Sequence, residues 1–166
     1  MEKKFEETLE KCVGIMNDCG FELPRIEFKL NGRFTSTLGR CIKLRDKEYM
    51  IEISKRYAQG CIETGNIRKL EQTILHEMAH TLPNGYNHGE IWKSYADIIN
   101  TKFGYKISRL ATVPNEIRQY WIKDGVRVCC DKCKRELLTP RNRKVVREPS
   151  SYRCSCGGKL KIKEVI

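Results

Sequence analysis

The sequence is short of histidine and has no long hydrophobic run. Its 166 residues include only three histidines, at His76, His80 and His88. No stretch of about 18 apolar residues occurs, so the sequence predicts no transmembrane helix and no membrane partner. Residues 1–7 also lack the apolar core of a secretory signal peptide. We therefore expect an intracellular, unsecreted protein whose histidine chemistry is confined to one short segment.

Without a signal peptide, the nine cysteines indicate reduced thiols or metal sites more than disulfides. Four of them have no metal-ligand spacing. Cys12 and Cys41 are predicted to be core residues, whereas Cys19 and Cys61 have no assigned role. The other five lie between residues 129 and 156, where pairs of thiols stand at the spacing of metal ligands.

Acidic residues are scarce near the C-terminus. The formal net charge is +11, of which residues 123–166 carry +8, with 13 Lys and Arg against 5 Asp and Glu. This change of composition predicts two domains, 1–122 and 123–166. A basic module favours a polyanion partner, usually nucleic acid, although a solubilising surface would have the same composition.

Hydrophobic periodicity predicts an α+β fold, with helices packed on a small antiparallel or mixed sheet and a small β-rich module after residue 123. The predicted helices cover residues 2–19, 66–80, 89–101 and 116–121. The predicted strands cover residues 26–30, 40–44, 49–53, 126–128 and 160–162. The second and third strands flank Asp46-Lys47 and are expected to form a hairpin, which either covers the core or offers an edge to a peptide.

The segment His76-Glu77-x-x-His80 has the spacing of a catalytic zinc site. Residues four apart lie on one face of a helix, so both imidazoles can point at one metal ion. Glu77 lies further round the helix, where its carboxylate can reach a water without binding the metal. The alternative is that these are ordinary helix residues.

A catalytic zinc requires a third protein ligand and an open position for water. His88 is the remaining histidine, and the Pro83-Asn84-Gly85 turn lets the chain double back toward the metal. Zinc lowers the pKa of a bound water, and Glu77 is expected to take its proton during cleavage of a peptide bond. Candidates for the oxyanion donor are Tyr57, Tyr86 and nearby arginines.

The predicted helix over 89–101 follows the third ligand directly. Trp92 on this helix either contacts substrate or packs behind the metal ligands, and its apolar neighbours favour packing. The residues expected to share its face are Ile91, Tyr95, Ile98 and Ile99.

The C-terminal cysteines predict one structural zinc ion in a zinc ribbon. The proposed ligands are the C-x2-C pair Cys130 and Cys133 and the C-x-C pair Cys154 and Cys156. Cys129 is an alternative to Cys130. The competing interpretation is a set of free thiols, but so small a module needs a metal or disulfide to fold.

The loop between the cysteine pairs is strongly basic. Its cations are expected to contact nucleic-acid phosphates, and Tyr152 either stacks on a base or packs beside the zinc site. The candidate phosphate-binding residues are Arg141, Arg143, Lys144 and Arg147.

The order His76-Glu-x-x-His80, a short loop, then His88-Gly89-x-x-Trp92 resembles the SprT-like (Spartan-type) metalloprotease family. The resemblance is sharp over residues 74–92 and extends to the C-terminal cysteine module, which many members carry. It implies a minimal zincin fold, zinc held by the three histidines, a catalytic Glu77, and DNA-bound or DNA-crosslinked proteins as substrates.

Together these features predict a zinc metalloendopeptidase of the HExxH type with one catalytic and one structural Zn2+. DNA is the expected partner, bound through the ribbon. The alternatives are a non-proteolytic DNA-binding or adaptor protein and a peptidase without a nucleic-acid role. The sequence leaves the oligomeric state open.

Overall fold

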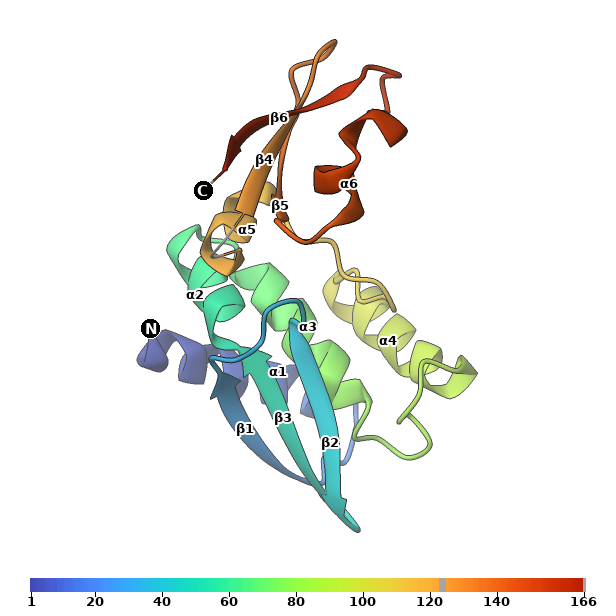
Figure 1. The fold of residues 1–166 in the computed structure, drawn as a ribbon. Coiled ribbons are helices and arrows are strands. Elements are labelled where there is room, and N and C mark those ends of the chain that lie inside the picture. Colours follow the sequence, from blue (N-terminus) through green and yellow to red (C-terminus); the bar gives the residue numbers. More distant parts are fainter. Residues whose placement is uncertain (123–124, 166) are drawn as a thin grey trace. The chain divides into compact units, whose positions relative to one another are not determined.

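The computed structural model describes residues 1–122 and 125–165. These residues form an α+β protein, as predicted, with six α-helices, one 3-10 helix and two small sheets (Figure 1). The chain divides into two compact units, Met1–Val113 and Pro114–Ile166. The boundary expected at residue 123 falls on residues outside those that the structure describes.

The sheet of the first unit has three strands, β1 (Arg25–Asn31), β2 (Gly39–Arg45) and β3 (Glu48–Ser54). Their order is β1-β3-β2, with β1 parallel and β2 antiparallel to β3, so the sheet is mixed. The predicted β2-β3 hairpin is confirmed. Ile51 and Ile53 on the central strand are fully buried, which fixes the face of the sheet that turns toward the helices.

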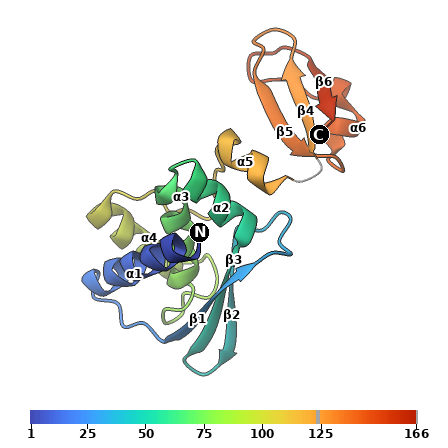
Figure 2. The ribbon, with the colours of Figure 1, turned by 90° about the vertical axis from the view of Figure 1, so that its left-hand side faces the viewer.

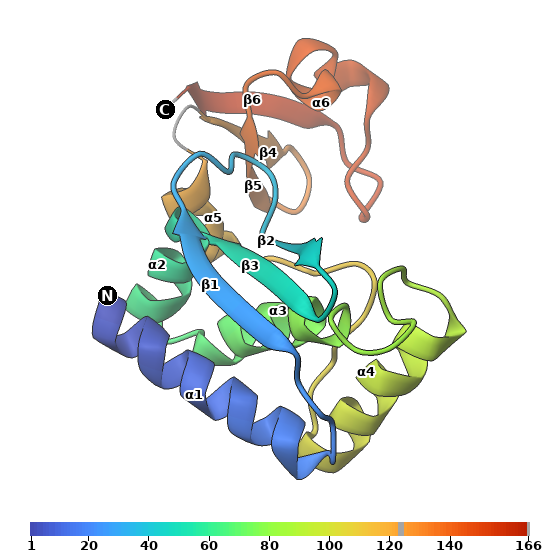
Figure 3. The ribbon, with the colours of Figure 1, turned by 90° about the horizontal axis from the view of Figure 1, so that it is seen from below.

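Three helices cover one side of this sheet (Figure 2). They are α1 (Glu2–Asp18), α3 (Ile67–Ala79) and α4 (Glu90–Phe103), and α3 lies between the other two (Figure 3). Because α3 is central, it is buried on nearly all sides. Its fully buried apolar residues are Leu70, Ile74, Leu75, Met78 and Ala79.

Helix α2 (Lys55–Glu63) was not predicted. It starts directly after β3, where the Ser54 hydroxyl accepts a hydrogen bond from the Tyr57 amide (3.4 Å) as an N-cap. Its apolar residues are few, and Gly60 lies in its interior, so its helical periodicity is weak. Cys61 on this helix is a core residue, whereas Cys41, predicted to be in the core, is half-buried.

The predicted buried face of α4 was partly wrong. Ile91 and Ile98 are 46% and 44% exposed, and the buried residues are Trp92, Ala96 and Ile99. This set has the i, i+4, i+7 spacing of one narrow stripe. Helix α4 has more apolar residues than this stripe can bury. The apolar residues alone therefore did not show which face of the helix is buried.

The second unit is a small antiparallel sheet with short helices. Strands β4 and β6 were predicted, whereas β5 was not; the sheet order is β5-β4-β6. Among the described residues, no helix combines the length and apolarity that crossing a bilayer requires. The elements are α5 (Asn115–Trp121), β4 (Gly125–Cys130), β5 (Glu136–Pro140), α6 (Lys144–Arg147), a 3-10 turn (Pro149–Ser151) and β6 (Leu160–Val165).

Candidate metal centres

The three histidines converge on one point. His76 and His80 lie at the C-terminal end of α3, and His88 comes from the loop before α4. The His88 Nε2 atom lies 2.9 Å from His76 Nε2 and 3.2 Å from His80 Nε2. Nitrogen ligands about 2.0–2.1 Å from a tetrahedral zinc stand roughly 3.3 Å apart. The three nitrogens therefore fit a zinc ion with little movement.

The Nδ1 atoms of the two α3 histidines are hydrogen-bonded to backbone carbonyls. His76 Nδ1 donates to the Ser108 carbonyl (3.1 Å), and His80 Nδ1 donates to the Gly85 carbonyl (2.9 Å). A carbonyl can only accept, so each ring carries its proton on Nδ1. This tautomer leaves the Nε2 lone pairs free and directed toward the metal position.

The chain between α3 and α4 brings His88 back to the helix. Asn84 adopts a left-handed conformation (φ 56°), which asparagine tolerates better than most residues. The Tyr95 hydroxyl donates to the Pro83 carbonyl (3.0 Å) and ties this turn to α4. The predicted turn at Pro83 to Gly85 therefore has a defined anchor on the following helix.

Trp92 lies against all three ligand rings. Its ring centroid is 4.7 Å from those of His76 and His88 and 5.4 Å from that of His80. Only 1% of its surface is exposed, and its Nε1 has no acceptor among the described residues. Trp92 therefore positions the histidines by ring packing, as predicted.

Burial keeps the three imidazoles neutral. It lowers the pKa of His76 to about 3, with smaller contributions from His80 and His88. Burial also lowers the pKa of His80, and burial together with Arg109 lowers that of His88. A neutral imidazole is the form that binds a metal. The cluster is therefore ready for a cation at neutral pH.

Glu77 is buried beside the histidines. Burial raises the pKa of its carboxyl to about 7, opposed by a backbone hydrogen bond with Cys41 of β2. Gly39, at the start of β2, lies so close that a Cβ there would stand 2.8 Å from Glu77 Cγ. Gly39 was not predicted as a site residue, because a single glycine gives no signal of which side chain it approaches.

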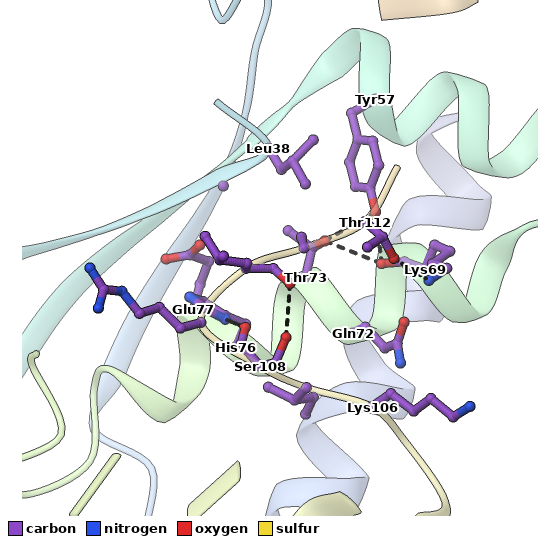
Figure 4. Close-up of a pocket in the computed structure, with 15 residues that line it drawn as sticks. Leu38, Tyr57, Lys69, Gln72, Thr73, His76, Glu77, Lys106, Ser108 and Thr112 are labelled. Atoms are coloured by element: carbon purple, nitrogen blue, oxygen red, sulfur yellow. Dashed lines mark hydrogen bonds between the residues drawn. The ribbon is translucent and has the colours of Figure 1, made fainter. Parts of the chain in front are cut away.

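A pocket of about 390 Å³ opens beside His76 and Glu77 (Figure 4). One face of α3 forms part of its lining, with Thr73 and Gln72 one turn and Lys69 two turns before His76. The opposite wall is the segment 106–112, for which no helix or strand was predicted. Residues Leu38, Gly39 and Tyr57 complete the lining.

The wall segment is hydrogen-bonded to α4 through Ile107 and to α3 through Ser108. Asn100 of α4 donates to the Ile107 carbonyl (2.9 Å) and accepts from the Ile107 amide (2.7 Å). The next residue, Ser108, accepts from His76. Ile107 is buried, so the wall is a fixed part of the first unit.

Of the two tyrosines named from the sequence as oxyanion donors, Tyr57 lines the pocket and Tyr86 does not. The Tyr57 hydroxyl donates to the Lys69 carbonyl (2.9 Å) and accepts from the Thr73 hydroxyl (3.1 Å). Tyr86 is 59% exposed. Among the arginines, Arg109 lines the pocket and is close enough to His88 to lower its pKa.

The predicted cysteine ligands also come together. Sγ–Sγ distances are 3.5 Å between Cys130 and Cys156 and 3.6 Å between Cys133 and Cys154, and all four sulfurs lie within 4.8 Å of one another. Thiolates about 2.3 Å from a tetrahedral zinc stand roughly 3.8 Å apart. Cys129 is outside this group, and its sulfur contacts the Lys134 carbonyl (3.8 Å).

Backbone hydrogen bonds favour the thiolate form at Cys130 and Cys154. The Cys133 amide donates to Cys130 Sγ (3.5 Å), and a backbone hydrogen bond with Cys156 contributes most to lowering the pKa of Cys154 to about 6. The C-x-C pair is followed by Gly158, where a Cβ would stand 2.5 Å from Cys130 Sγ. The C-x-C pair Cys154 and Cys156 therefore requires glycine at residue 158, where a side chain would collide with the Cys130 sulfur.

The four cations predicted to contact phosphates are exposed. Lys144 and Arg147 lie on α6, and Arg143 immediately precedes it. Tyr152 is partly exposed, at 36%. These exposed side chains can be reached by a ligand in solution. That the ligand is nucleic acid stays a prediction.

A family model described as the SprT-like family matches residues 3–112. This range includes the three histidines and Glu77 and ends before the cysteine cluster. No curated protein matches the chain. The two ligand clusters and the family match together indicate zinc as the metal that these residues suit.

Proposed function

Since the chain belongs to the SprT-like family, whose domains are zinc metallopeptidase-like, we propose that it is a zinc-dependent endopeptidase that cleaves proteins bound or crosslinked to DNA. The single observation that carries the peptidase proposal is the convergence of three neutral histidine nitrogens next to a buried glutamate at the end of a pocket. One zinc ion would be catalytic and held by histidines, and one structural and held by cysteines.

The chemistry follows from the ligand set and Glu77. His76, His80 and His88 would hold a zinc ion, which would supply a Lewis acid and lower the pKa of a bound water. Glu77 lies one residue from a ligand and is not itself one, so its carboxylate is the proton acceptor. The same carboxyl group then returns the proton to the leaving amine.

The edge of the sheet supplies a place for the substrate backbone. β2 pairs only with β3 among the described strands, so its other edge can pair with an extended peptide. Gly39 at the start of this strand approaches Glu77 directly. A peptide along β2 would therefore pass the proton acceptor.

The ribbon supports the nucleic-acid part of the proposal. Residues 123–166 carry +8, and four thiolates with one Zn2+ would reduce this to about +6. Its exposed basic residues Arg141, Arg143, Lys144 and Arg147 are the proposed phosphate contacts. The ribbon would thus bring the peptidase to proteins on DNA.

Glu77→Gln tests the proposed reaction. We expect cleavage of a DNA-binding protein to fall about 1000-fold or more, because the amide cannot accept a proton. Zinc content should stay at the wild-type value. Wild type should cleave faster with DNA than without it, and this stimulation should shrink as salt rises, since phosphate contacts weaken.

The outcomes separate the alternatives. Equal cleavage by wild type and Glu77→Gln would show that Glu77 is not the proton acceptor. Cleavage that is indifferent to DNA would leave a peptidase and contradict recruitment by the ribbon. DNA binding without any cleavage would favour the adaptor function.

Gly39→Ala should lower kcat/KM about 10- to 100-fold, because the added methyl group displaces the Glu77 carboxylate by a fraction of an ångström or more. Gly32→Ala is the matched control, since a Cβ there meets no atom within 4 Å. Both variants should keep the wild-type zinc content. Equal activity of the two variants would show that the approach of Gly39 to Glu77 has no catalytic consequence.

A further inference from the structure

The pocket beside Glu77 carries an excess of positive charge. Lys69, Lys106 and Arg109 line it, whereas Glu77 is its single carboxylate. Across residues 1–122 and 125–165, none of the three cations has a carboxylate within ion-pair distance. The Lys69 ammonium makes a long hydrogen bond to the Thr112 hydroxyl (3.4 Å). These charges are therefore available to a ligand.

Two of the cations gather at one end of the pocket. In Figure 4, Lys69, Gln72 and Lys106 lie together on one side, and His76 and Glu77 lie on the other. Lys69 precedes His76 by seven residues on α3, which places them on one helix face about 10 Å apart along the axis. The far end of the pocket is thus lined by two lysines and one glutamine.

The rest of the lining suits a polypeptide. Leu38, Ile107, Leu110 and Ala111 give the pocket apolar surface between its polar groups. A nucleic-acid backbone is usually bound by exposed basic surface, such as that around α6. A partly enclosed pocket with apolar walls and unpaired ammonium groups fits a peptide that carries a carboxylate.

We propose that Lys69, Lys106 and Gln72 form an anion subsite that binds a carboxylate of the substrate polypeptide. An extended peptide advances about 3.3 Å per residue, so the carboxylate belongs about three residues from the cleaved bond. Either an Asp or Glu side chain or the chain's terminal carboxylate supplies this chemistry. The inference rests on the proposed peptidase function and specifies its substrate class.

A peptide series tests the subsite with the full-length zinc protein. Peptides blocked at both ends carry glutamate or glutamine at each position within about four residues of one mapped bond. We expect glutamate to raise kcat/KM about tenfold at one position. The Lys69→Met/Lys106→Met protein should lose this preference and cleave each glutamate peptide at the same rate as its glutamine counterpart. Lys55→Met, an exposed lysine of α2 outside the pocket, should keep it.

Binding of the same peptides to Glu77→Gln protein, measured by fluorescence anisotropy, gives a readout that needs no cleavage. A further peptide ends in a free carboxylate at the preferred position, so that a terminal carboxylate can be compared with a glutamate side chain. Tighter binding of either peptide than of the glutamine peptide supports the subsite. Cleavage of all peptides without preference would overturn the subsite and leave the peptidase. Cleavage of none, with the glutamate preference retained in binding, would overturn the peptidase alone.

Nucleic acid is the remaining alternative occupant. If the Lys69→Met/Lys106→Met change weakens binding of a single-stranded oligonucleotide and leaves peptide binding unchanged, the pocket contacts phosphates and the proposal is wrong. Unchanged oligonucleotide binding together with a lost glutamate preference is the expected result.

Discussion

Replacing His88 by alanine should remove one zinc ion per chain and lower kcat/KM about 1000-fold or more. His88 supplies the one ligand from outside α3, and its Nε2 lies 2.9 Å and 3.2 Å from those of the two α3 histidines. Without it, two nitrogens remain, which is fewer than a catalytic zinc requires. Metal content, measured by mass spectrometry on the purified chain, should fall from two ions to one, with the ribbon ion retained.

Lys93→Met is the matched control for this experiment. Lys93 is exposed on α4, one residue after Trp92, and among the described residues its ammonium contacts only Glu90. The control should keep two ions and full activity, and the melting temperature of both variants shows whether the first unit stays folded. Two ions and full activity in His88→Ala would exclude His88 as a ligand.

The histidine cluster could be predicted because its geometry is mostly local. Helical periodicity puts His76 and His80 on one face, and the chain has a single further histidine. The turn before His88 was also visible in the sequence. The structure brings these residues together as that spacing predicts, and the family match agrees with the resemblance on which the fold was predicted.

The surroundings of the cluster could not be predicted, because they come from distant parts of the chain. Ser108 accepts from His76 through its backbone carbonyl, which every residue type possesses. Gly39 approaches Glu77 from another element altogether. Neither position has a side-chain signal that sequence patterns could detect.

The pocket lining was missed although part of it has a local signal. Lys69, Gln72 and Thr73 precede His76 by seven, four and three residues, so they share its helix face. This spacing was sufficient to place them near the site. The opposite wall, residues 106–112, was hidden because an irregular segment has no periodicity.

The ribbon should unfold when its zinc ligands are reduced to three. Among residues 125–165, the buried large apolar side chains are Val126, Val128 and Leu138, a core too small to offset the chain entropy of folding. Structural zinc in small modules contributes about 10–16 kcal/mol to folding. Cys133→Ser should therefore lose the ribbon ion and make residues after about 114 sensitive to a trace protease.

The effect should be confined to the ribbon, because the two units have separate metal clusters and separate cores. Cys133→Ser should keep one zinc ion and the wild-type rate on a small peptide, and lose DNA stimulation. Cys129→Ser is the control: its sulfur lies outside the cluster, and it should behave as wild type. If Cys129→Ser loses the ion and Cys133→Ser keeps it, the ligand assignment is wrong. If Cys133→Ser stops peptide cleavage without losing the histidine ion, the peptidase depends on a folded ribbon, and the two units are coupled.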